Sequence, residues 1–154
     1  MGISEGMDTR ELDELAKRMF QVAEKDYPAE AKDFMKREGN KGRRELRAKT
    51  KAVTKKKTGN LLKGIRRTGV QKYNGDFQIR VYNKAPHAHL IEHGHILWIN
   101  GHNTGRMVPG KHPAATTVKQ LKKEFPRDVE GFVDRKSTRL NSSHALLSRM
   151  PSSA

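Results

Sequence analysis

The dipeptide Asn74-Gly75 is the feature that most constrains the fold of this chain. It stands between two runs of β-forming residues, Ile65–Tyr73 and Phe77–Tyr82, and an Asn-Gly pair in that position favours a two-residue hairpin turn. The second run, F-Q-I-R-V-Y, alternates between apolar and polar side chains. It therefore predicts an antiparallel hairpin whose inward face carries Phe77, Ile79 and Val81.

Before and after the hairpin, apolar residues follow the spacing of amphipathic helices. The first helix is expected from about Thr9, with Gly39 and Gly42 loosening its end. Pro28 should either kink it or begin a second helix, with Asp26 as a cap. The closing helix shows core spacing and an expected kink at Pro126. Its predicted core positions are Val118, Leu121, Phe125, Val129 and Phe132.

Between the hairpin and the closing helix, Pro86 is placed to begin a short helix that Gly94 ends. Ile96–Ile99 predicts a third strand, and Arg106–Pro109 can return as a fourth. The sequence thus predicts an α+β fold: a long N-terminal helix, a small antiparallel sheet of about four strands with a short helix inserted, and a C-terminal helix. We expect residues 1–133 to form one domain.

Residues 134–154 are interpreted separately, because D-R-K-S-T-R-L-N-S-S-H resembles a translated sequencing adapter. On that interpretation the segment is an artefactual disordered tail, and the native reading frame is truncated near Val133. The alternative is a genuine Ser-rich disordered tail.

Charge is the main compositional signal, with 32 Lys and Arg against 17 Asp and Glu and a net charge of +15. Lys36–Lys57 holds eleven of the bases and two of the acids. Such a run attracts polyanions, of which nucleic acid is the usual one, although a solvated connector is an equally good interpretation. The candidate contact residues are Lys41, Arg43, Arg44, Arg47, Lys49, Lys51, Lys55, Lys56 and Lys57. The absence of cysteine excludes disulfides and thiolate metal sites, and no apolar run is long enough to span a membrane.

The segment His89–His93 matches H-x-x-E-H, the pattern of a zinc hydrolase. His89 and His93 would bind the metal on one helix face, and Glu92 would activate water. A five-residue match is weak evidence, and the helix that Gly94 ends is short. We therefore expect no catalytic residue, metal or cofactor, and keep the zinc hydrolase as a third hypothesis.

Three segments together resemble the tail-completion, or head-tail neck, family of small virion proteins from long-tailed bacteriophages. The first is Phe34–Gly42. The second has two parts, K-K-K-T-G-N-L-L-K-G-I at residues 55–65 and V-Y-N-K-A-P-H-A-H-L-I-E-H-G-H at residues 81–95. The third is V-P-G-K-H at residues 108–112. The resemblance covers residues 8–133 and departs from the family at His93 and at Pro113-Ala114. It implies that the signature positions are structural: Thr58, Gly59, Asn60, Leu61, Ala85, Pro86, Glu92 and Gly94.

The resemblance implies a non-enzymatic virion protein that acts in tail completion and head-tail joining. It would form a homo-oligomeric ring, assembled in the bacterial host cytoplasm. Expected partners are other virion proteins, namely a connector or stopper and a tail terminator or tail tube, with non-specific contact to DNA and no membrane. A free basic nucleic-acid-binding module is the alternative function.

Overall fold

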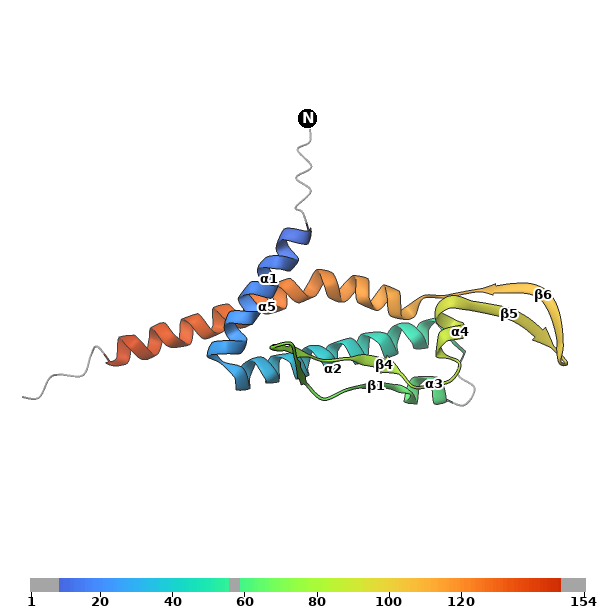
Figure 1. Ribbon diagram of the computed structural model, residues 1–154, viewed down its shortest axis with the longest axis horizontal. Coiled ribbons are helices and arrows are strands. Elements are labelled where there is room, and N and C mark those ends of the chain that lie inside the picture. Colours follow the sequence, from blue (N-terminus) through green and yellow to red (C-terminus); the bar gives the residue numbers. More distant parts are fainter. Residues whose placement is uncertain (1–8, 56–58, 148–154) are drawn as a thin grey trace, which may run out of the picture.

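The computed structural model describes residues 9–55 and 59–147 of the chain. A long helical body carries a thin strand ribbon along one side and a hairpin that projects from one end (Figure 1). The helices are α1 Thr9–Asp26, α2 Pro28–Val53, α3 Asn60–Lys63, α4 Ala88–His93 and α5 Pro113–Leu147. The strands are β1 Ile65–Arg67, β2 Gln71–Tyr73, β3 Asp76–Gln78, β4 Val81–Asn83, β5 Gly94–Ile99 and β6 His102–Pro109.

Pro28 begins a second helix, which is one of the two predicted outcomes. Tyr27 takes the cap position with a non-helical backbone, φ −136°, because the residue before a proline is kept out of the helical region. The expected capping role of Asp26 is wrong, since Asp26 is the last residue of α1 and α2 has no side-chain cap. The break lets α1 turn out of the line of α2 and cross α5 (Figure 1).

The core lies where α1, α2 and α5 meet. Its buried side chains are Ala16, Phe20, Ala23, Ala31, Phe34, Met35, Val129 and Phe132. Phe34 stacks on Phe132 with ring centroids 4.9 Å apart. Each buried aromatic side chain of this kind stabilises the fold by about 2 to 3 kcal/mol.

The closing helix is confirmed, and Figure 1 shows that it bends along its length, with Pro126 inside it. One predicted core position is wrong: Val118 is 52% exposed, and Thr117 is buried instead. The Thr117 hydroxyl donates to the Pro113 carbonyl at 2.8 Å, which satisfies its polar group inside the helix. Helix α5 continues to Leu147, into the segment expected to be a disordered tail. The domain boundary at residue 133 and the adapter origin stay predictions.

Gly39 and Gly42 do not loosen α2, which continues through both of them. Both are buried because neighbouring elements approach the helix backbone there. A Cβ at Gly39 would overlap the Ile79 side chain, and one at Gly42 would lie 3.2 Å from Leu121 of α5 and 3.5 Å from Val81 of β4. These glycines are therefore close-packing positions on the helix.

The predicted hairpin forms, with Asn74 and Gly75 at φ 51° and 95° in the turn between β2 and β3. The same ribbon continues as β1 paired with β4, in the register Ile65↔Asn83 to Arg67↔Val81. Between the two ladders the Thr68 amide donates to the Arg80 carbonyl at 2.9 Å. Phe77 and Ile79 pack on the helical core, as the alternation predicted.

The expectation of one sheet of about four strands is not confirmed, because the strands pair two by two. β5 pairs with β6 through a turn at Asn100 and Gly101, both with positive φ. β6 also begins at His102, before the predicted Arg106, and an irregularity opposite Leu97 interrupts its register. The inserted α4 turns the chain away from the ribbon, so this hairpin leaves the body instead of joining a larger sheet (Figure 1).

Candidate assembly site

The residues around the C-terminal end of α4 form what we call the α4 joint: Glu92, Gly94, Gly110 and Lys111. Glu92 accepts hydrogen bonds from the first amides of α5, from Ala114 at 2.8 Å and from Ala115 at 2.9 Å. Those amides have no partner within the helix, and a carboxylate there also suits the positive end of the helix dipole. Glu92 therefore fixes the start of α5 against α4.

Gly94 and Gly110 let two backbone segments cross at this joint. Gly94 has φ 85° and ψ 173°, a conformation that glycine alone adopts readily. A Cβ at Gly94 would lie 2.5 Å from the Val108 carbonyl oxygen and 2.8 Å from the Gly110 amide. A Cβ at Gly110 would overlap the backbone of Glu92 and His93 in turn. The base of the projecting hairpin is thus held by backbone packing.

Lys111 ties the joint to the rest of the body. Its amide donates to the Ile91 carbonyl of α4 at 2.8 Å, and its Nζ donates to the Val53 carbonyl, the last residue of α2, at 2.6 Å. A lysine at a helix C-terminus satisfies a carbonyl that the helix leaves open. The sequence prediction missed Gly110 and Lys111 as individual site residues, although both lie in the V-P-G-K-H segment that carried the resemblance.

Five of the other signature residues gather around one cavity of about 590 Å³ between the ends of α2 and α4. Its lining includes Gly59, Asn60, Leu61, Ala85 and Pro86. Gly59 has φ 77°, and the Asn83 side chain links the two segments: its Nδ2 donates to the Leu61 carbonyl at 3.2 Å and its Oδ1 accepts from the Ala85 amide at 3.0 Å. Thr58 lies outside the described residues. The structural role of these positions remains a prediction, but the fold brings the two segments together.

The H-x-x-E-H residues do not converge on a metal site in the part of the chain that the structure describes, where no group of three His, Cys, Asp or Glu residues could hold an ion. His89 and His93 lie one turn apart on α4. Glu92, which would have to activate water, already accepts two hydrogen bonds from α5. The geometry therefore gives Glu92 a structural use.

Two of the candidate cationic residues point inward, into a polar seam between α2 and α5. Lys41 Nζ lies 2.5 Å from Asp128 and 2.8 Å from Glu124. Lys49 Nζ donates to Gln120 Oε1 at 2.6 Å and to the Thr116 carbonyl at 3.2 Å. Both lysines hold α2 to α5, and the charge of Lys41 is paired with carboxylates of α5.

The seam shifts the pKa values of its groups in opposite directions. Partial burial acts to lower the pKa of Lys41, but its hydrogen bonds to Asp128 and Glu124 outweigh this and raise the pKa above the ordinary lysine value. The hydrogen bonds from Lys41 and Gln120 lower the pKa of Glu124. Burial, together with the charge of Asp128, raises the pKa of Glu38. Lys41 is thus the main group that favours the ionised form of Glu124.

We expect Lys41→Met to lower the melting temperature at pH 7, because the seam carboxylates then repel one another without a cation. Glu124 has a lowered pKa, so its contribution to stability is present above the ordinary value of 4.5 and is lost as the pH falls through the folded-state pKa. The difference between wild type and variant should therefore shrink below about pH 4.5. Thermal unfolding across pH 3 to 7 would show this trend. Lys122→Met, at an exposed position of α5, is the control; an equal, pH-independent loss in both variants would contradict the prediction.

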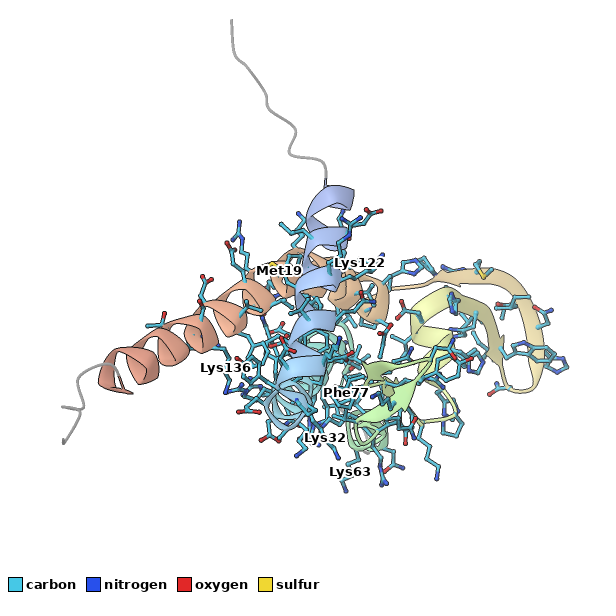
Figure 2. The ribbon with its side chains drawn as sticks, turned by 60° about the vertical axis from the view of Figure 1, so that its left-hand side comes forward. Met19, Lys32, Lys63, Phe77, Lys122 and Lys136 are labelled. Carbon is cyan, nitrogen blue, oxygen red and sulfur yellow. The ribbon has the colours of Figure 1, made fainter. Side chains whose placement is uncertain are left out.

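The remaining cations of α2 share its outward face, because residues at steps of three, four and seven lie on one side of a helix. The exposed ones are Lys32, Lys36, Arg37, Arg43, Arg44, Arg47 and Lys51. Figure 2 shows Lys32 pointing away from the body. Lys55 is exposed beyond the end of the helix, and Lys56 and Lys57 lie outside the described residues.

The β5–β6 hairpin exposes four large apolar side chains: Ile96, Trp98, Ile99 and Met107. Ile96 stands opposite Met107 in the ladder, and Trp98 is 61% exposed. Isolated exposed apolar residues are ordinary, but several together on a projecting hairpin are typical of a protein-contact surface. Sequence reasoning placed a strand here and gave it no functional role.

Comparison with known families matches residues 13–94 to the HK97-gp10-like family, described as "Bacteriophage HK97-gp10, putative tail-component". The matched range is more than half of the chain. It holds most of α1, all of α2, the ribbon, and the α4 joint as far as Gly94, and it ends before α5. Searches of curated proteins and of solved structures gave no significant match. Among the helices of residues 9–55 and 59–147, none is long and apolar enough to cross a bilayer. With its family match spanning the two signature segments that the fold brings together around α4, the chain belongs to the HK97-gp10-like family of bacteriophage tail components.

Proposed function

We propose that this protein is a non-enzymatic structural protein of the virion that completes the tail and joins it to the connector at the head. Family membership supports a role as a tail component. The observation that carries the finer proposal is the projecting hairpin, whose apolar side chains are exposed while its base is fixed by the α4 joint. A rigidly anchored arm of this kind suits assembly, because little conformational entropy is lost when it binds a partner.

In the proposed assembly, the hairpin of one copy contacts the body of the next copy, so that the copies form a ring. The hairpin and the helical body are different surfaces, and repeated contacts between two different surfaces close into a ring when the rotation allows it. The ring faces would then meet the connector or stopper on one side and the tail terminator or tail tube on the other.

The experiment that tests this proposal is complementation of a phage or prophage whose copy of the gene is interrupted. We expect DNA-filled heads and separate tails by electron microscopy, with joined particles restored by the gene supplied in trans. Normal joined particles in the absence of the protein would overturn the proposal.

The hairpin contact is tested by Trp98→Ser in the same complementation assay. We expect a loss of joined particles, because an exposed aromatic anchor of this kind contributes about 2 kcal/mol or more to an interface. Tyr73→Ser is the matched control, since Tyr73 is 62% exposed at the tip of the other hairpin. The free energy of unfolding of both purified variants should lie within about 0.5 kcal/mol of the wild-type value, as is usual for surface substitutions. Equal particle yields from the two variants would contradict the role of the hairpin.

A second candidate function is non-specific contact with DNA, favoured by the outward cations of α2. If copies form a ring around the DNA path, the cationic face of α2 can line the inside of the ring. Alternatively, the same face can contact an acidic ring formed by a partner protein. Absence of duplex DNA binding even at low salt would remove the DNA version. The zinc hypothesis requires stoichiometric zinc that is lost in His89→Ala, together with a hydrolytic activity that is lost in Glu92→Gln.

A further inference from the structure

The ribbon carries a second cationic surface, separate from the basic run in the sequence. Along residues 79–84 the side chains alternate, so that Ile79 and Val81 face α2 while Arg80, Tyr82 and Lys84 face solvent. The β1–β4 register places Arg66 directly opposite Tyr82. We call Arg66, Arg80, Tyr82 and Lys84 the outer ribbon face.

The charges of this face form no ion pair within the described part of the chain. In residues 9–55 and 59–147, the ion pairs of the structure involve Arg18, Lys36, Lys41 and Lys136, and none involves Arg66, Arg80 or Lys84. The exposed acid of the ribbon is Asp76, which lies at the Asn74-Gly75 turn and not between these cations. Three positive groups therefore surround Tyr82, which is 39% exposed.

The spacing of these groups suits a polyanion with regularly repeated charges. Alternate residues of a strand lie about 6.6 Å apart, so Arg80, Tyr82 and Lys84 present donors at even steps along one line. Arg66 adds a guanidinium beside the central tyrosine, about 5 Å across the ladder. Arg, Lys and Tyr are all common donors to phosphate oxygens of a nucleic-acid backbone.

The composition of the face argues against an acidic protein as its main partner. Protein interfaces have an apolar centre that excludes water, and here the four outward side chains are two arginines, a lysine and a tyrosine. The exposed apolar residues lie instead on the β5–β6 hairpin. A partner made of phosphates needs no apolar centre.

We propose that the outer ribbon face is a DNA-binding surface that contacts backbone phosphates of duplex DNA without reading its sequence. This inference rests on the proposed role at the head-tail junction, where the protein would meet DNA. It adds Arg66, Arg80, Tyr82 and Lys84, which no sequence motif marks, to the cations of α2.

The test is binding of a short fluorescent DNA duplex to the full chain by anisotropy, over a series of salt concentrations. The test variant replaces Arg66, Arg80 and Lys84 by Gln. Its matched control replaces Lys119, Lys122 and Lys123 by Gln, which removes the same charge from exposed positions of α5. In Figures 1 and 2 α5 lies above α2 and the ribbon lies below it, so the control leaves the outer ribbon face intact.

We expect the ribbon variant to bind about tenfold or more weakly at low salt, by loss of counter-ion release. Its log-log salt slope should fall by about one for each substituted cation that contacts a phosphate. The α5 control should keep wild-type affinity and slope. Replacing Arg43, Arg47 and Lys51 of α2 by Gln measures the other surface independently.

Equal losses in the ribbon variant and the α5 control would overturn the proposal, since net charge alone would then explain binding. Unchanged binding in the ribbon variant, or no binding by wild type at low salt, would also overturn it. Matching melting temperatures of all variants show that folding is intact. Tail completion is measured separately by particle assembly. A failure of DNA binding would therefore contradict the DNA-binding surface without contradicting the proposed role in tail completion.

Discussion

Gly94→Ala is expected to destabilise the protein by at least about 3 kcal/mol, which is a large part of the stability of an ordinary domain. Two costs add at this position. The backbone at φ 85° and ψ 173° is strained for any residue with a Cβ. The added methyl group would also press on the backbone of Val108 and Gly110, which cannot rotate away as a flexible side chain could. Urea unfolding gives the change in the free energy of unfolding.

Gly105→Ala is the matched control for this prediction. Gly105 also has a positive φ, 68°, but a Cβ there would meet nothing within 4 Å. Its substitution should therefore cost only the conformational strain, about 1 kcal/mol. If Gly94→Ala costs no more than Gly105→Ala, the backbone segments do not cross as closely as the structure indicates, and the α4 joint is not a rigid anchor for the hairpin.

Glu92→Ala should cost about 2 kcal/mol, because two amides at the start of α5 lose a charged acceptor. The pairs concerned are those with Ala114 and Ala115, at 2.8 and 2.9 Å. Glu92→Gln should restore about half of this loss, since its single carbonyl can accept from one amide but its NH₂ group faces the other. Chemical unfolding of the three proteins under the same conditions measures these differences.

The control for Glu92 is Glu130→Ala, at an exposed position on α5 itself. That substitution should change the free energy of unfolding by no more than about 0.5 kcal/mol. A loss in Glu92→Ala as small as in this control would remove the anchoring role. A Glu92→Gln variant that was as stable as wild type and assembled normal particles would show that the second carboxylate oxygen of Glu92 has no structural role.

Local sequence determined the features that depend on one or two residues. Asn74-Gly75 forms the ribbon turn because both residues tolerate positive φ, and Pro28 begins α2 because its ring and missing amide hydrogen suit the first helical turn best. Gly94 ends α4 for a similar local reason. The alternation in Phe77–Tyr82 also set which side chains face the core. These features depend on interactions within a few residues, so the sequence is sufficient to predict them.

Only the tertiary structure decided which cations, glycines and strands contact one another. A run of cations does not say which lysines contact a distant helix, so the inward positions of Lys41 and Lys49 depended on how α5 packs. Gly39 and Gly42 look like helix breakers until the ribbon and α5 are placed against them. The strands pair two by two, and Glu92 reaches α5, because long-range packing chose among partners that local propensity leaves equivalent. Sequence alone thus determined the long helices and the Asn74-Gly75 hairpin, whereas burial and pairing between distant segments determined how the strands combine and which surfaces remain exposed.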